Sequence, residues 1–381
     1  MENIITSNEE ALADLRTNII SVKSTKNYNG AITNFIFWIY LNCQSEVCDD
    51  MRGILDPHKS AYEVSLAQVS SQDLIAEVRD SRISKLQTTY FRTQKKRIKT
   101  WFTQTSASRN RTPPVQLSSI TGDIVTSYLL SLTKLNGDPP SYSHYGTHRA
   151  SVKHLFRVYR APVPDDFDEI MALDFKSLRR QVANRVNNEG DVVQVGKSPI
   201  EYSLYSFVAR QFLEASTRES VFENSFFTLC WGLMARVGNI EAICLNHIEW
   251  ENDSFVIYFA QGKTDQGGEN AKYPRHLYAN PTCPQICPVL NLPIYLLCFP
   301  IQDSQVKLFH GSSQYERFRK QLDKNLKLNC LAELDSRGLG VEQIGTHSIR
   351  KGAASFAASG TTASPSALAI HLRAGWSFSG V

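Results

Sequence analysis

The segment Val221–Met234 limits the possible folds of this chain more than any other feature. Its sequence, VFENSFFTLCWGLM, places apolar side chains on almost every side of a helix. A helix of this kind is stable only when other elements of the same domain cover it. We therefore expect Val221–Met234 to be buried on all sides, within a domain formed by the second half of the chain.

Shorter patterns around this segment predict a mixed set of elements. The expected elements are a helix over 198–215, strands over 255–260 and 272–278, and helices over 315–328 and 347–359. Ser198 and Pro199 suit the N-cap and first position of the helix that follows them. The segment 261–270 carries three glycines between the two strands, which predicts a hairpin with a long turn.

The first half of the chain reads as helices joined by polar loops. Apolar residues recur there at three- and four-residue spacings over 26–41, 84–103, 123–133 and 145–159. Thr121 is the expected N-cap of the third of these helices. The pattern predicts an all-helical domain.

The length of 381 residues favours two domains. The sequence APVPDDFDE is acidic and contains proline, and NNEGDVVQVG is polar and contains glycine, as linkers often do. We therefore predict a helical domain over 1–165, a linker over 166–197 and a second domain over 198–381. The predicted fold class is mainly α with a small antiparallel β-sheet.

Positive charge is concentrated in one part of the chain, although the net charge is only +4. No acidic residue occurs from Ser81 through Gly122, where nine basic residues occur. Such a block suits a polyanion, because each cation that meets a phosphate releases a counterion; the alternative is a solvated helix face. The predicted DNA-contacting residues are Lys85, Arg92, Lys95, Lys96, Arg97, Lys99, Arg149, Lys153 and Arg157.

Composition excludes several other classes of protein. An apolar share of 42% with 20% charged residues is typical of a globular protein, and no apolar run approaches the roughly 18 residues of a membrane span. The acidic, polar N-terminus does not resemble a signal peptide. Cys283 and Cys287 lack a matching second pair of ligands, so we expect reduced thiols, no metal site and an intracellular protein.

Four elements of the second half carry residues suited to chemistry on a phosphate. Arg236 follows the apolar helix, where it indicates an anion site or a salt bridge to Glu241. Lys263 lies at the tip of the expected hairpin. His347 and Arg350 share a helix face, near an N-terminus that Thr346 is expected to cap. Trp376 lies at a helix-to-turn corner, where a packing role is the alternative.

The order of these residues resembles that of the tyrosine recombinases. The match consists of Arg236, Lys263, His347-Ser348-Ile349-Arg350 and Trp376, and GTHSIRKGAASFAASG followed by HLRAGWS is most similar to the Crypton-type transposon recombinases of eukaryotes. The resemblance covers the chain in detail from Ser198 onwards, and more loosely in the helical first half, which would be the family's core-binding domain. It implies a clamp around double-stranded DNA, self-association there as a tetramer, and a nuclear location.

The resemblance also implies a role for each residue. Arg236 and Arg350 would hold the non-bridging oxygens of the scissile phosphate, and Lys263, or Lys272 on the return strand, would protonate the leaving oxygen. His347 would assist proton transfer, and Trp376 would donate its indole N–H to a phosphate oxygen or pack against the site. No cofactor is implied, because a covalent phosphotyrosine conserves the bond energy.

Two departures from the family pattern matter. The family commonly carries an acidic residue three positions after the first arginine, where this sequence has Asn239. The nucleophilic tyrosine would fall about nine residues after Trp376, beyond the last residue, Val381. We therefore expect a recombinase truncated before its nucleophile, which binds DNA without cleaving it; the alternative is a non-catalytic binding or scaffold protein that retains the fold.

Overall fold

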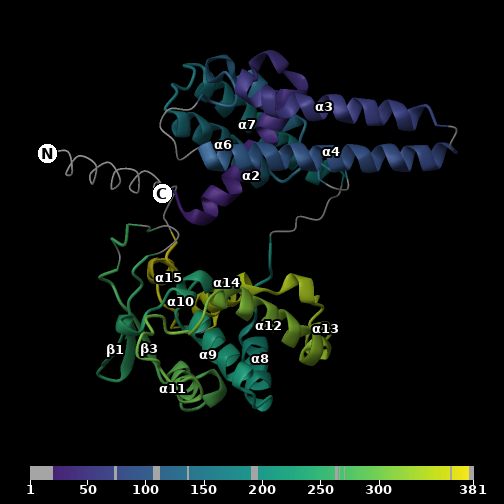
Figure 1. Ribbon diagram of the computed structural model, residues 1–381. Helices are drawn as coiled ribbons and strands as arrows, with labels where there is room; N and C mark the ends of the chain where they lie inside the picture. Colours follow the sequence, from purple (N-terminus) through teal and green to yellow (C-terminus); the bar gives the residue numbers. More distant parts are fainter. Residues whose placement is uncertain are drawn as a thin grey trace. The chain divides into compact units, whose positions relative to one another are not determined.

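The chain folds into two compact units, Met1–Val193 and Gln194–Val381. The computed structural model describes residues 20–72, 75–105, 112–134, 137–189, 196–261, 265, 267–269, 271–360 and 363–376. Both units are mainly helical, and the second also contains a small antiparallel sheet (Figure 1). The predicted fold class is confirmed. No helix within the described ranges is both long and apolar enough to cross a membrane.

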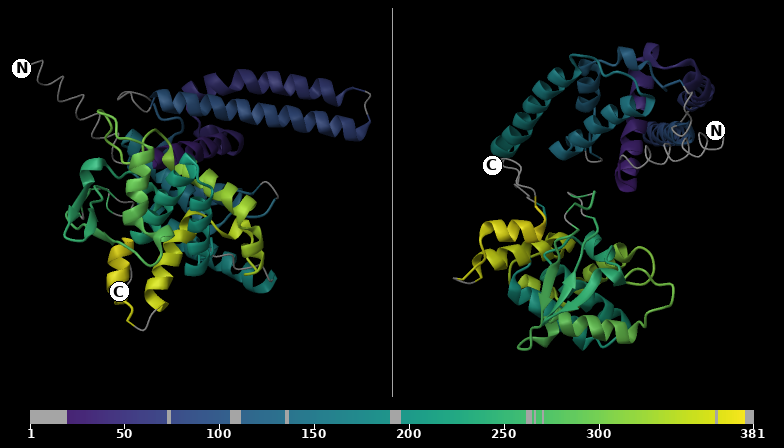
Figure 2. Two further views of the ribbon diagram at one scale, coloured as in Figure 1. Left: turned by 90° about the horizontal axis from the view of Figure 1, so that it is seen from below. Right: turned by 90° about the vertical axis from the view of Figure 1, so that its left-hand side faces the viewer.

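The first unit is a bundle of helices with a long helical hairpin. Its helices are α2 (Val22–Asn42), α3 (Asp49–Ser70), α4 (Ala76–Thr105), α5 (Gly122–Leu130), α6 (Tyr142–Tyr159) and α7 (Phe167–Glu189). Helices α3 and α4 run side by side along the hairpin (Figures 1 and 2). Helix α2 packs against both α4 and α6, and its apolar stripe lies in the core of the unit. Thr121 caps α5 as predicted, because its hydroxyl accepts from the Ile124 N–H.

The predicted linker over 166–197 is wrong for most of its length. Residues Phe167–Glu189 form α7, and Phe167, Met171, Phe175 and Leu178 of this helix are buried in the core of the first unit. The apolar residues of α7 stand at helical spacing, but the acidic and proline-bearing sequence ahead of them suggested a loop. The two units divide in the sequence after Val193, inside the predicted linker and close to its end.

The second unit is formed by eight helices and three strands among its described residues. The helices are α8 (Tyr202–Glu214), α9 (Arg218–Gly232), α10 (Val237–Glu241), α11 (Pro288–Cys298), α12 (Gln314–Asn329), α13 (Leu331–Asp335), α14 (Thr346–Ser359) and α15 (Ala367–Ala374). The strands are β1 (Ile248–Glu251), β2 (Ser254–Ile257) and β3 (Arg275–Tyr278). The sheet order is β1-β2-β3, and both pairs are antiparallel.

Helix α9 is buried on all sides, as its sequence predicts. Its polar side chains from Ser220 to Thr228 are buried as well, and most of them donate a hydrogen bond to a backbone carbonyl. Ser225 donates to the Asn291 carbonyl of α11 at 2.6 Å, and Asn224 donates to the Gln285 carbonyl at 3.2 Å. These bonds fix α9 against its neighbours along its length.

The predicted hairpin consists of β2 and β3, and a third strand, β1, pairs with the other edge of β2. Strand β1 is mostly exposed, and although its sequence, IEWE, alternates apolar and acidic residues, four residues are too few to single out a strand. Asn252 stands in the tight turn between β1 and β2 with φ of 54°, a conformation that asparagine tolerates better than most residues.

The prediction that Ser198 and Pro199 begin a helix is wrong. Helix α8 begins at Tyr202, and the segment before it runs alongside the start of α14. The Ser198 N–H donates to the Gln343 carbonyl at 2.8 Å, and the Ile200 N–H donates to the Ser348 carbonyl at 3.1 Å. Helix α14 therefore has a fixed backbone partner at its N-terminal end.

A buried histidine makes the first unit sensitive to acid. His148 of α6 is only 4% exposed, and its Nδ1 lies 2.6 Å from the Tyr128 hydroxyl. Burial, with a smaller contribution from the neighbouring His144, lowers the pKa of His148 to about 4. In the unfolded chain the His148 imidazole is protonated below pH ~6.5, whereas in the folded unit it is protonated only below pH ~4.

We predict that this difference destabilises the first unit as the pH falls from 7 to 4, by at most about 3 kcal/mol. Amide hydrogen exchange in α6, measured across this pH range, reports the loss. In His148→Gln the acid-induced increase in exchange should be smaller, while the control His58→Gln on α3 should behave as the wild type. Equal pH dependence in His148→Gln and the wild type would contradict the prediction.

Candidate functional site

Four arginines from four elements converge in the second unit. Arg236 is the N-cap residue of α10, Arg275 stands on β3, Arg350 on α14 and Arg373 on α15. Burial, and then the positive charges of Arg373, Arg350 and Arg236, together lower the pKa of Arg275 to about 10. The charges of the other three arginines therefore act on Arg275, and we call the four guanidinium groups the arginine cluster.

Backbone carbonyl groups hold the arginine cluster in place. Arg275 Nη1 donates to the Leu233 carbonyl at 3.0 Å, and Arg373 Nη2 donates to the Gly232 carbonyl at 2.7 Å. Both carbonyls belong to the C-terminal end of α9, which carries the partial negative charge of the helix dipole. Arg373 Nη2 also donates to the His276 carbonyl of β3 at 2.8 Å. The buried helix thus orients two of the four cations.

Arg350 is the most buried member of the arginine cluster, at 6% exposure. Its Nη2 donates to the Ala374 carbonyl, and its Nε is buried without a hydrogen-bond partner among the described residues. Burial, and then the charge of Arg236, lowers the pKa of Arg350 to about 10, so the group remains charged at neutral pH. A buried guanidinium with an unused donor is costly unless an anion occupies the site.

The arginine cluster lacks carboxylate partners within the described part of the chain. None of the four arginines forms an ion pair there, although ion pairs occur elsewhere in the second unit. Glu241, a predicted alternative partner of Arg236, instead accepts the backbone N–H of Tyr315 at 3.0 Å and so caps α12. The positive charge of the cluster is left to attract an external anion.

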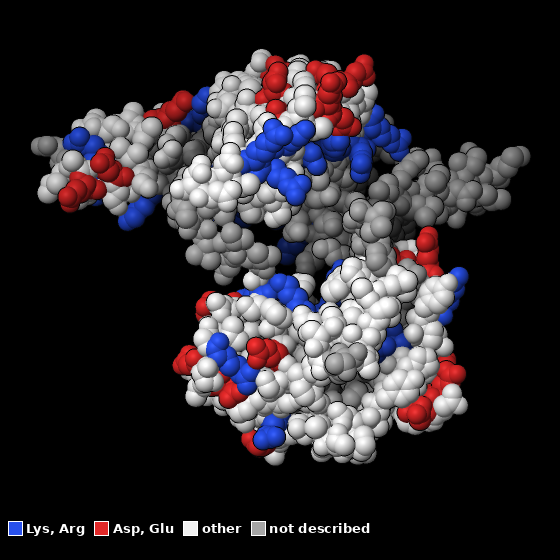
Figure 3. Space-filling view, turned by 180° about the vertical axis from the view of Figure 1, so that it is seen from behind, with Lys and Arg blue, Asp and Glu red and all other residues white. Residues whose placement is uncertain are grey.

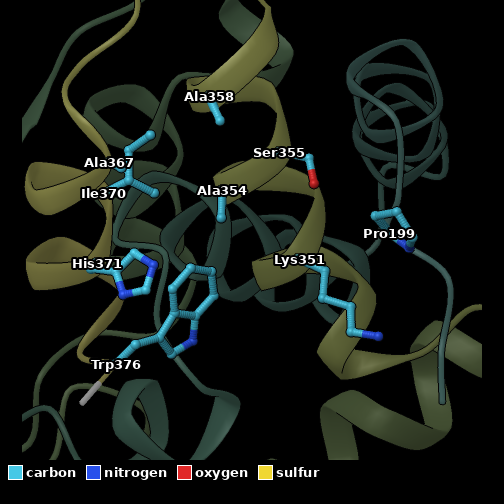
Figure 4. A pocket seen from close by; sticks show the side chains of 9 residues that line it. All are labelled: Pro199, Lys351, Ala354, Ser355, Ala358, Ala367, Ile370, His371 and Trp376. Carbon is cyan, nitrogen blue, oxygen red and sulfur yellow. The ribbon is translucent and has the colours of Figure 1, made fainter. Parts of the chain in front are cut away.

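Trp376 lies against the arginine cluster. The Arg350 guanidinium is 5.4 Å from the centre of the indole ring, within the range of a cation–π contact. The His371 ring meets the indole edge to face at 5.0 Å. Figure 4 shows His371 and Trp376 together on one side of a groove of about 340 Å³ between α14 and α15, with Lys351 and Pro199 on the other side.

His347 is exposed on the first turn of α14, three residues before Arg350. The N-cap of this helix is Gly345, not Thr346 as predicted, and the Gly345 N–H donates to the Ser348 hydroxyl at 3.0 Å. Gly352 lets α14 pack closely on the segment that precedes α8. A Cβ at this position would lie 2.0 Å from the Ile200 carbonyl oxygen of that segment. These contacts set the position from which Arg350 enters the site.

The structure does not test the roles of the two candidate general acids. Lys263 lies outside the described residues. Lys272 is exposed, with its Nζ 5.3 Å from the ring of Tyr273. The role of either lysine stays a prediction.

The basic residues of the first unit fall into two groups. Arg82, Lys85, Arg92, Lys96 and Lys99 are exposed on one face of α4, because their spacings of three, four and seven residues return to the same side of a helix. We call this face the basic stripe. On one face of the first unit, Lys and Arg side chains gather next to a group of acidic ones (Figure 3).

The other predicted DNA contacts are partly engaged inside the first unit. Lys95 Nζ lies 5.5 Å from the Phe37 ring, and burial lowers its pKa. The Arg149 guanidinium stacks 3.9 Å from the ring centre of Phe175, and Lys153 pairs with Asp168. Of the remaining two, Arg97 is half-buried and Arg157 is exposed. Contact of any of these residues with DNA stays a prediction.

Arg275 and Arg373 were not predicted from the sequence. Arg275 stands in the four-residue strand RHLY, opposite Ile257 of β2. An arginine that faces an apolar residue inside a sheet indicates a buried charge. Arg373 stands in the last turn of α15, a position where cations are common for the helix dipole alone. The sequence therefore offered little reason to single it out.

No protein-family model matches this chain, and no curated protein matches it. Among solved structures, the chain is similar to the XerH site-specific recombinase bound to difH substrate in a pre-cleavage complex. The TM-score is 0.41, and the identity is 13% over 92% of this chain and 90% of that chain. A post-cleavage complex of XerH with a palindromic difH substrate gives a TM-score of 0.43 and 13% identity over the same shares. Both likenesses are distant, so the chemistry of the site is what bears on function.

We predict that inorganic phosphate stabilises the second unit through the arginine cluster. At a phosphate concentration ten times Kd, linkage gives a rise in Tm of about 3–6 °C relative to chloride at equal ionic strength. Scanning calorimetry measures it. The rise should be lost in Arg236→Ala and kept in Arg210→Ala, which removes an exposed arginine of α8 outside the cluster. A full rise in Arg236→Ala would rule out the cluster as the phosphate site.

Proposed function

We propose that this protein binds double-stranded DNA and holds one phosphodiester of its backbone in the arginine cluster, as a strand-exchange protein of the tyrosine-recombinase type. The observation that carries the proposal is a set of four guanidinium groups without carboxylate partners among the described residues, one of which has a buried, unpartnered Nε. Guanidinium groups bind phosphate oxygens through paired hydrogen bonds, which a buried site strengthens.

The arrangement suits the transition state of phosphoryl transfer. A pentavalent phosphorane carries more negative charge on its non-bridging oxygens than the diester does, so Arg236 and Arg350 would stabilise it more strongly than the ground state. Trp376, already in contact with Arg350, would hold this guanidinium in place or donate its indole N–H. Arg275 and Arg373 add charge to the same site.

The covalent step needs a tyrosine hydroxyl. Its oxygen would form an ester with the phosphorus, the bond from phosphorus to the 5′ oxygen would break, and this oxygen would take a proton from Lys263 or Lys272. His347 would accept the proton of the tyrosine. The second candidate function is DNA binding without cleavage, in which the arginine cluster holds a phosphate and no bond is broken.

The basic stripe of α4 is proposed as a second contact with the DNA backbone. Its outermost members, Arg82 and Lys99, are seventeen residues apart, which corresponds to about 25 Å along the helix. Contacts of this kind supply affinity without sequence information. The sequence resemblance further supports a Crypton-like class, tetramers on DNA and a nuclear location, and these stand as proposals.

We predict that two sets of residues contribute separately to binding. Fluorescence anisotropy with a labelled duplex, over a range of salt concentrations, should give a linear dependence of log K on log salt. Lys96→Ala/Lys99→Ala should reduce the slope by about 1.8, while Lys96→Arg/Lys99→Arg should keep it. Arg236→Ala should weaken binding by about tenfold. Unchanged slopes and affinities in all variants would contradict DNA binding through these residues.

Cleavage is tested separately with a nicked suicide duplex, which traps any covalent intermediate. An adduct that is lost in Arg350→Ala favours the strand-exchange enzyme. Binding without any adduct favours the second candidate, a DNA-binding protein that does not cleave.

A further inference from the structure

A pocket lined by aromatic rings lies in the second unit beside the arginine cluster. Its volume is about 300 Å³, and its walls come from α8, α9, β3, α14 and α15. The aromatic residues that line it are Tyr202, Tyr205, Trp231, His276, Tyr278 and Phe356. So many rings around one cavity suit a flat, π-rich ligand.

The rings of this pocket are already ordered in stacked pairs. Tyr205 and Trp231 stack at 4.0 Å with 10° between their planes, and Tyr202 and Phe356 stack at 4.4 Å with 13°. Tyr278 and Phe356 are 59% and 37% exposed, so a ligand can reach them from solvent. The pocket therefore has a rigid floor and an open rim.

The charge of the pocket selects among flat ligands. Arg373 lines it, and none of the described residues that line it is acidic. An aromatic cage for a quaternary ammonium ligand is disfavoured, because the guanidinium would repel a cation. A ring with hydrogen-bond acceptors, joined to an anionic group, fits both the rings and the arginine.

Arg373 also connects the pocket with the phosphate site. It is a member of the arginine cluster, since its charge acts on Arg275, and its Nη2 joins the end of α9 to β3. A ligand that places its anion on the cluster therefore has the aromatic pocket next to it. Nucleotides have this combination of a phosphate and a flat base.

We propose that the aromatic pocket receives an unpaired base from DNA whose phosphate lies in the arginine cluster. This inference rests on the proposed function and adds to it a preference for DNA with an extrahelical base. A base that leaves the duplex exposes both faces, and stacking on aromatic side chains offsets the loss of stacking in the helix.

The test compares two labelled duplexes of the same sequence by anisotropy. One carries a single-adenine bulge, and the other carries an abasic nucleotide at the bulge, which bends the duplex in the same way without offering a base. The protein should bind the adenine bulge at least about fivefold more tightly than the abasic one. Phe356→Ala and Tyr278→Ala should each abolish this preference and leave the affinity for fully paired DNA unchanged.

Trp250→Ala is the matched control, because Trp250 is an equally exposed aromatic residue of β1 outside the pocket, and it should keep the preference. Equal affinity of the wild type for the two bulges would overturn the pocket, as would a preference that survives in both Phe356→Ala and Tyr278→Ala. A third outcome separates the two proposals: the preference depends on Phe356 and Tyr278, but Arg236→Ala binds every duplex as the wild type does. This result would support the aromatic pocket as a base-binding site and contradict the arginine cluster as the phosphate-binding site.

Discussion

The candidate site depends on the way in which backbone carbonyls replace carboxylates as partners of buried arginines. The C-terminal end of α9 supplies two of these carbonyls, to Arg275 and Arg373, and the end of α15 supplies a third, to Arg350. A carbonyl orients a guanidinium without neutralising it. The fold therefore concentrates positive charge, which a set of salt bridges would have cancelled.

This arrangement explains why α9 has to be buried and fixed. Its polar side chains bond to carbonyls in and around α11, so the carbonyls at its C-terminal end cannot move independently of the core. Burial, and then the charges of neighbouring arginines, lower the pKa of Arg275 and Arg350 to about 10, so holding these cations in the fold carries a cost from burial and from charge repulsion. A bound phosphate would offset part of this cost.

Sequence patterns predicted the elements with strong periodicity and the residues that fit a recognisable order. The buried α9, the hairpin of β2 and β3, and the helix that carries His347 and Arg350 are found where expected. Arg236, Arg350 and Trp376 lie in one region, although their roles remain predictions. Arg275 and Arg373 could not be predicted, because only the packing of β3 and α15 against the end of α9 brings them to the site. Helix α7 was missed although its apolar residues stand at helical spacing, because the acidic, proline-bearing sequence ahead of it favoured a linker.

The most direct test of the account is chemical protection of Arg236, which is half-buried and can react with phenylglyoxal, an arginine-specific reagent. Mass spectrometry gives the rate of modification at each arginine with and without a saturating amount of duplex DNA. The account predicts that DNA slows the modification of Arg236 several-fold and leaves that of Arg210, exposed on α8, unchanged. Modification of Arg236 at the same rate in free and DNA-bound protein would contradict the claim that the arginine cluster holds a phosphate.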